Sequence, residues 1–126
     1  MKHTFFEKNQ YQVVKEFQKS KFTIQYAWNH ESTQLELVFD PSQDYWDDMV
    51  EKLDNGTWVH IVAKVSVHYD GQEISSDFLG SVICEDPLKW FENDGADQVE
   101  GMVEELIEEA KVICINRLAK MQADFS

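Results

Sequence analysis

The sequence has few of the residues that interrupt folded elements or join them covalently. Two prolines and five glycines in 126 residues exclude a linker rich in either residue. Cys84 and Cys114 stand far apart among apolar neighbours, which indicates reduced, buried thiols rather than a disulfide framework. No apolar run approaches the roughly 18 residues of a membrane helix, and the first residues lack the apolar segment of a signal peptide. The sequence therefore predicts a cytoplasmic protein without membrane contact.

Motifs for metal binding and catalysis are also missing. His60 and His68 share a strand face but lie about 27 Å apart at strand rise, too far for one metal ion. No glycine is placed as a calcium loop requires. The sequence lacks a nucleophile elbow, a phosphate-binding glycine loop and a zinc-protease helix. Ser75, Ser76 and Asp77 face the region of His68 across a hairpin, an arrangement that hairpins carry routinely. These absences predict a protein that is not an enzyme and has no cofactor or metal.

Positive charge is scarce, and negative charge is concentrated. The chain has 24 acidic and 11 basic residues, a net charge of −13, and Arg117 is its one arginine. Residues 40–55 hold six acids against Lys52, and residues 84–109 hold ten against Lys89. Such a field repels nucleic acid and anionic membranes, and it attracts basic protein surfaces. The predicted partner is therefore a basic protein, and direct binding to nucleic acid is excluded.

The length of the chain predicts a single domain, residues 1–126. Residues 4–20 place their apolar side chains near helical spacing, which predicts a first helix. Residues 21–29 and 33–39 alternate apolar and polar side chains, which predicts two strands joined in a hairpin by His30, Glu31 and Ser32. The apolar positions of the expected helix are Phe6, Val13, Val14 and Phe17.

The middle of the chain predicts a helix and a second hairpin. A helix is expected over residues 42–56, with Ser42 as its cap and Gly56 at its end. Residues 57–84 alternate strongly on either side of Asp70-Gly71, which predicts two long strands and a tight turn. The expected buried stripe of the helix is Tyr45, Trp46, Met49, Val50 and Leu53.

Two helices are expected after the second hairpin. Asp86 and Pro87 have the chemistry of an N-cap and a first helical position. Gly95 ends this short helix, and the last helix runs from Ala96 to about Met121. The complete prediction is an α+β fold of order α-β-β-α-β-β-α-α. It has a four-stranded antiparallel sheet of two hairpins, with helices packed on one face.

The last helix changes character along its length. Its expected apolar side is Val99, Met102, Val103, Leu106, Ala110, Ile113, Cys114 and Met121. Val112 and Ile115 instead point toward the side that carries glutamates earlier in the helix. Something is expected to cover this apolar end. It is covered either by the rest of the fold or by a partner, and a homodimer through the last helix is one reading.

The acids of two helices are the candidate partner-binding residues. Like charges at helical spacing destabilise a helix slightly, and the helix dipole favours acids near its N-terminus only. Acids spaced along a rigid helix resemble the phosphates of DNA in charge and repeat. The candidates are Asp97, Glu100, Glu104, Glu105, Glu108 and Glu109 in the last helix, and Asp44, Asp47, Asp48 and Glu51 in the middle one.

Small size, strong acidity and the absence of catalytic motifs resemble a known type of protein, the phage- or mobile-element-encoded inhibitors of bacterial defence. These include anti-CRISPR and anti-restriction DNA mimics. The hairpin VHYDGQEISSDFLGSV also looks like one found in phage-related proteins. The resemblance is one of type, without a family motif, and it implies a non-enzymatic inhibitor of a host defence nuclease complex.

Other classes fit the same composition. An acidic homodimeric secretion chaperone has similar size, and an immunity protein against a nuclease toxin has similar charge. A solvated acidic surface without a partner is the third alternative.

Overall fold

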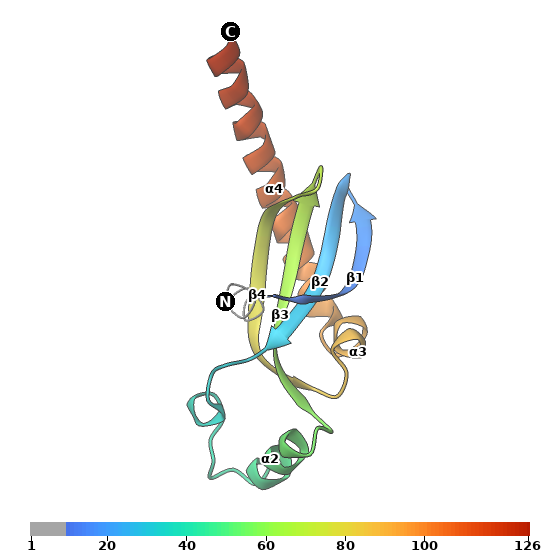
Figure 1. The fold of residues 1–126 in the computed structure, drawn as a ribbon, viewed down its shortest axis with the longest axis vertical. Helices are drawn as coiled ribbons and strands as arrows, with labels where there is room; N and C mark the ends of the chain where they lie inside the picture. The colour runs from blue at the N-terminus through green and yellow to red at the C-terminus, as the bar shows by residue number, and fades with distance from the viewer. Residues whose placement is uncertain (1–9) are drawn as a thin grey trace, which may run out of the picture.

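A computed structural model describes residues 10–126 of the chain. Its centre is a four-stranded antiparallel sheet in the order β1-β2-β3-β4 (Figure 1). The α+β prediction, with helices beside an antiparallel sheet, is confirmed. The strands are β1 (Gln12–Lys19), β2 (Phe22–His30), β3 (Val59–Tyr69) and β4 (Gln72–Cys84).

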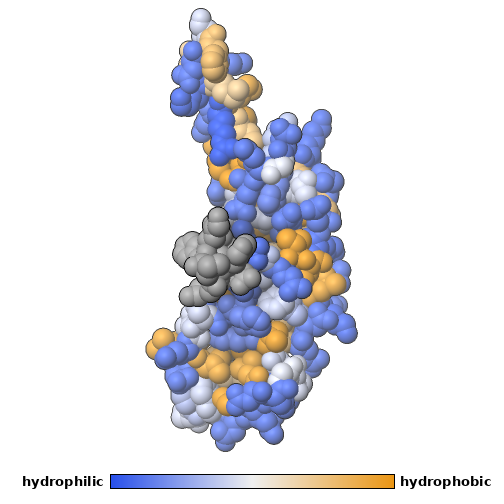
Figure 2. Space-filling model, viewed as in Figure 1, coloured by the Kyte–Doolittle hydropathy of each residue, from blue (hydrophilic) through white to orange (hydrophobic). Residues whose placement is uncertain are grey.

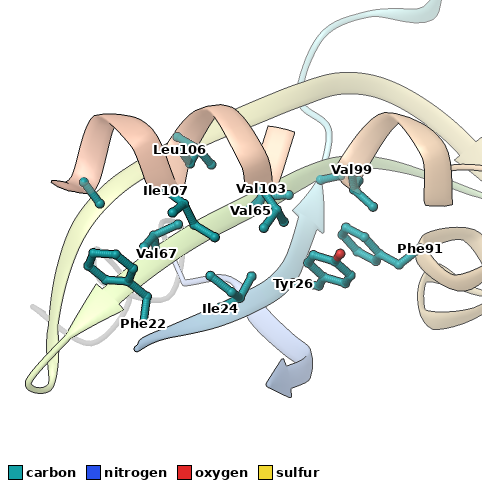
Figure 3. Close-up of a cluster of buried hydrophobic side chains, with 12 residues drawn as sticks. Phe22, Ile24, Tyr26, Val65, Val67, Phe91, Val99, Val103, Leu106 and Ile107 are labelled. Atoms are coloured by element: carbon teal, nitrogen blue, oxygen red, sulfur yellow. The ribbon is translucent and has the colours of Figure 1, made fainter. Parts of the chain in front are cut away.

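Two helices cover one face of the sheet and close the core. They are α3 (Pro87–Glu92) and α4 (Ala96–Phe125). Side chains from β2, β3 and the first half of α4 interleave between the layers (Figure 3). Phe91 of α3 is 1% exposed and stacks on Tyr26, with ring centroids 4.9 Å apart. The Asp86 side chain accepts hydrogen bonds from the N–H groups of Leu88 and Lys89, so the expected cap is confirmed.

The sequence predicts a first helix over residues 4–20. This prediction is wrong for residues 12–19, which form β1. Residues 1–9 lie outside the described part of the chain. The pairing of β1 with β2 shifts between Val13 and Lys15, which marks a β-bulge. Because the bulge inserts one residue, Val14 and Phe17 both pack against the core. Their spacing of three, typical of a helix, arises here within a strand.

The expected second strand, residues 33–39, is also wrong. This segment contains the short 3-10 helix η1 (Leu35–Leu37), and Leu37 is 76% exposed. Both edges of β2 are occupied, by β1 and β3, so no edge remains for another strand beside it. The first hairpin therefore joins β1 to β2, and its turn is at Ser20 and Lys21 rather than at residues 30–32.

Residues 31–58 leave the sheet and return to it, and they carry α2 (Trp46–Asp54) beyond the end of the strands (Figure 1). A helix in this region is confirmed, but it does not lie on the sheet face. Tyr45, not Ser42, is at its N-cap, and the Ser42 hydroxyl donates to Asp40 in the preceding turn. Only Met49 of the expected stripe is buried. A helix outside the two layers has too little neighbouring surface to cover a full stripe.

The second hairpin agrees with the sequence. Asp70 and Gly71 have φ angles of 53° and 80°, as a tight turn between twisted strands requires. The pairing of β3 with β4 shifts again between Ile61 and Ala63. Ser81 lies opposite this shift and has a φ of 56°.

Helix α4 is longer than the sheet face that it covers. Ala110 is its last buried residue, and the helix continues to Phe125, projecting past the strands (Figure 1). Ile107 belongs to the buried side, whereas Met121 is 57% exposed, so the predicted apolar side is wrong at these two positions. Nothing within residues 10–126 covers Val112 and Ile115, which are 57% and 65% exposed.

Candidate protein-binding site

The six candidate acids of α4 lie on its exposed sides, and two of them, Glu100 and Glu104, border the sheet, where they line a hollow with Lys15 and Lys19 of β1. All six are exposed. At 1.5 Å rise per residue, they span about 18 Å, or about one carboxylate per 3.6 Å of helix axis. Phosphates along one DNA strand repeat about every 3.4 Å. The helix thus carries negative charge at nearly the density of a single DNA strand. The residues are Asp97, Glu100, Glu104, Glu105, Glu108 and Glu109.

Lysines neutralise part of this acidic helix. Lys19 of β1 lies 2.8 Å from Glu104, and Lys111 lies 3.1 Å from Glu108. The hydrogen bond and charge of Lys19 hold the pKa of Glu104 below its usual value. Asp97, Glu100, Glu105 and Glu109 have no ion pair with any residue in 10–126.

The candidate acids of the middle helix form a separate group. Asp44, Asp47, Asp48 and Glu51 are exposed on and just before α2. Asp48 pairs with Lys52 at 3.1 Å. Because α2 lies beyond the end of the sheet (Figure 1), these acids do not extend the row on α4. Asp48 instead lines a groove together with Asp94, which precedes α4.

This groove lies between the 31–58 segment, the end of β4 and helix α3, and its volume is about 860 Å³. Phe39, Tyr45, Trp58 and Trp90 supply aromatic surface. Figure 2 shows apolar surface at this end of the molecule, bordered by hydrophilic surface. Four carboxylates also line the groove, against one lysine, Lys89. They belong to Asp48, Glu85, Asp86 and Asp94.

Two contacts position the aromatic walls. Trp90 meets Phe91 edge to face, with centroids 5.1 Å apart, and its indole lies so close to Gly95 that a Cβ there would approach it to 2.5 Å. Across the groove, the backbone N–H of Trp58 donates to the Lys52 carbonyl at 3.0 Å, just before the chain enters β3. The Trp90 indole is therefore fixed by packing, whereas the hydrogen bond at Trp58 fixes the backbone of that residue.

A half-buried thiol, rather than the fully buried one that the sequence predicts, lines the groove. Burial, and then the charges of Asp86 and Asp94, raise the pKa of Cys84 to about 11. Both Cys84 and Cys114 are free. The charges of Asp86 and Asp94, which add to the effect of burial on the thiolate, would favour a cation.

The chain matches no protein family model, no curated protein and no solved structure.

The residues considered for catalysis and metal binding are used for packing or hydrogen bonding. The Ser75 hydroxyl donates to the Leu106 carbonyl of α4 at 2.9 Å, and Ser66 and His68 share a hydrogen bond of 2.8 Å. Burial lowers the pKa of His60, although Glu31 opposes this shift. In the described part of the chain, no three His, Cys, Asp or Glu residues cluster closely enough to hold a metal.

Within residues 10–126, no helix combines the length and apolar character that crossing a bilayer requires.

Sequence reasoning missed the groove and the lysines opposite α4. The groove needs the 31–58 segment to leave the sheet, whereas a strand was expected there. Lys15 and Lys19 point toward α3 and α4 only because residues 12–19 are a strand, and Lys15 pairs with Glu92 at 3.3 Å. The sequence feature that could have indicated the groove is the presence of aromatic residues beside acids in residues 39–58 and 84–94.

Proposed function

We propose that this protein is a non-enzymatic acidic binding protein that covers a basic, nucleic-acid-binding surface of a partner protein. A phage-encoded inhibitor of a host defence nuclease complex acts in this way. The observation that carries the proposal is the exposed row of carboxylates on α4, whose charge density approaches that of a DNA strand. The helix is anchored on the sheet through Val99, Val103 and Ile107, so the charges are held on a rigid element.

Charge favours a protein partner over nucleic acid. Residues 22–126 carry a net charge of −16, because the five lysines within residues 1–21 outnumber two glutamates there. Charge attraction of this kind accelerates association and is weakened by salt. We therefore expect affinity for the partner to fall steeply between about 50 and 200 mM salt.

The decisive experiment is competition with nucleic acid. A partner captured with the tagged protein is purified, and its binding to DNA or RNA is measured with and without this chain. The quadruple variant E104K/E105K/E108K/E109K is expected to lose both capture and competition. A matched variant with four reversals away from the row, E16K/E36K/D77K/D124K, is expected to keep both. Equal binding by the two variants, or a partner that binds no nucleic acid, contradicts the proposal.

The identity of the captured partner separates two versions of this function. A defence nuclease complex supports the inhibitor, whereas a nuclease toxin encoded beside the chain supports an immunity protein. In both, the acidic helix occupies the nucleic-acid site.

The projecting end of α4 favours a second candidate, a homodimer of the kind that acidic secretion chaperones form. Figure 2 shows apolar surface along this projection, and Leu118, Met121 and Phe125 are 56%, 57% and 87% exposed. Cys114, Leu118, Met121 and Phe125 follow a four-three-four spacing, which is typical of a coiled-coil seam. Three basic residues against Asp124 give residues 111–126 a charge of +2, so this end of the helix lacks the acidic excess of the rest of the chain.

A further inference from the structure

A concave site separate from the α4 row lies between α2 and α3. We propose that this groove binds the side chain of an arginine or lysine on an exposed segment of a protein partner, with its aromatic walls against the cation and its carboxylates around the charge. The proposal extends the proposed function by giving the partner a defined anchoring pocket. It does not depend on the acids of α4.

The shape of the groove suits a side chain. Its volume of about 860 Å³ lies within the range of ligand pockets and accommodates a long basic side chain with part of its backbone. Phe39 contacts Tyr45 with centroids 6.4 Å apart, so two of the aromatic walls support each other. Tyr45 is 47% exposed and is accessible to a guest.

The chemistry of the groove selects a cation. Its lining has four carboxylates and one ammonium group, and Lys52 pairs with Asp48, so the lining and Lys52 together have a net charge of −2. Aromatic faces attract ammonium and guanidinium groups within about 6 Å. An anionic guest would be repelled, and a neutral apolar guest would remove water from the Glu85 and Asp94 carboxylates without supplying a counter-charge.

The protein already holds one cation in this way. The Lys52 ammonium lies 4.4 Å from the centroid of the Trp58 ring and 3.1 Å from the Asp48 carboxylate. Trp90, Glu85 and Asp94 also line the groove, and none of them has an ion pair or a cation–π contact with another residue in 10–126. This part of the groove offers the same residue types without a lysine over the indole, and it is where an external cation would bind.

The test uses a pentapeptide of glycines with one central arginine, acetylated and amidated at its ends. Nitrogen-15 NMR follows the four indole N–H signals as the peptide is added. We expect the signals of Trp58 and Trp90 to shift in a saturable manner, whereas Trp28 and Trp46, which do not line the groove, serve as internal references. A peptide with citrulline in place of arginine has the same shape without the charge, and it is expected to cause no shift.

Two variants locate the binding. Glu85→Gln with Asp94→Asn is expected to weaken peptide binding several-fold, and Glu36→Gln with Asp77→Asn, which removes two exposed charges elsewhere, is expected to leave it unchanged. Shifts of all four indoles alike, equal shifts with the citrulline peptide, or equal weakening by both variant pairs would overturn the proposal.

The outcome is separable from that of the proposed function. The α4 variant E104K/E105K/E108K/E109K is expected to retain peptide binding in the groove. Loss of binding in that variant alone, with folding intact, would place the cation on α4 and reject the groove. Failure of the nucleic-acid competition with retained peptide shifts would reject the inhibitor and keep the groove.

Discussion

Glu31 accepts a hydrogen bond from the backbone N–H of Ser81 at 2.8 Å, across fifty positions of sequence. Glu31 follows β2 directly, and Ser81 lies in the bulge of β4, so the contact passes over β3. The Thr33 N–H and hydroxyl donate to the same carboxylate, at 3.2 Å and 3.0 Å. One side chain therefore fixes both the start of the 31–58 segment and the irregular part of β4.

The charge on Glu31 is expected to stabilise the fold at neutral pH. Partial burial pulls its pKa upward, but the hydrogen bonds from Ser81 and Thr33 outweigh burial and hold the pKa below its usual value near 4.5. A lowered folded-state pKa contributes stability above the unfolded value, and this contribution is lost as pH falls through the folded value. We expect Glu31→Gln to be less stable than the wild type at pH 7, by about 1 kcal/mol.

Urea denaturation across a pH series measures this difference. Glutamine keeps one accepting oxygen and places an NH2 donor at the position of the other, so the variant loses the charge together with one set of hydrogen bonds. The gap in unfolding free energy should begin to close below about pH 4.5 and become small once the carboxylate is protonated. A gap that stays constant down to about pH 3 would show that the charge of Glu31 does not stabilise the fold.

Two glycines of the α3–α4 region should respond oppositely to alanine. At Gly95 a Cβ would lie 2.5 Å from the Trp90 indole, so the ring must move, and we expect a loss of about 1–3 kcal/mol. Gly101 is exposed within α4, and a Cβ there meets nothing within 4 Å. Alanine there should stabilise the helix by about 0.5–1 kcal/mol.

Thermal denaturation of the two variants provides the measurement. Gly95→Ala should also alter tryptophan fluorescence, because Trp90 must move in the groove wall. The same sign of change for both variants would contradict the packing of Trp90 on Gly95.

The hydrogen bond from Ser75 ties the sheet to the last helix. Its hydroxyl is buried and reaches the Leu106 carbonyl at 2.9 Å. We expect Ser75→Ala to lower the unfolding free energy by about 1 kcal/mol, since a buried neutral hydrogen bond is lost. Ser32→Ala, at an exposed serine, should change it by less than about 0.5 kcal/mol. Equal effects of the two substitutions in denaturant titrations would argue against this contact.

The parts of the fold that the sequence predicted are those where local chemistry and tertiary environment agree. Asp70-Gly71 predicts its turn because both φ angles are positive there and glycine accepts one of them freely. The Ser20-Lys21 turn has positive φ at both residues as well, 53° and 69°, but neither residue type signals it. The sequence pattern therefore predicts the first hairpin one strand too late along the chain.

A β-bulge and the lack of a free sheet edge explain the other two wrong predictions of secondary structure. Val14 and Phe17 share the core face through a bulge, and this displaced strand periodicity imitates a helix. Residues 33–39 alternate correctly for a strand, yet β2 has no free edge to pair with them. The candidate site divides in the same way. The exposure of the acids on α4 can be predicted from helical periodicity. The groove cannot, because it depends on how segments distant in sequence pack together.

The projecting end of α4 is expected to pair with a second copy of the chain. If Leu118 and Met121 form the seam with Cys114 and Phe125, then Leu118→Gln with Met121→Gln should give a monomer, because the apolar contacts are removed without a change in charge. Val112→Gln with Ile115→Gln changes a different side of the same helix and should leave the dimer intact.

Light scattering coupled to gel filtration gives the mass of each variant over a concentration series, and circular dichroism confirms that α4 stays helical. A wild type that remains monomeric at the highest concentration rejects the seam. If both pairs give monomers, the contact surrounds the helix instead of following one stripe.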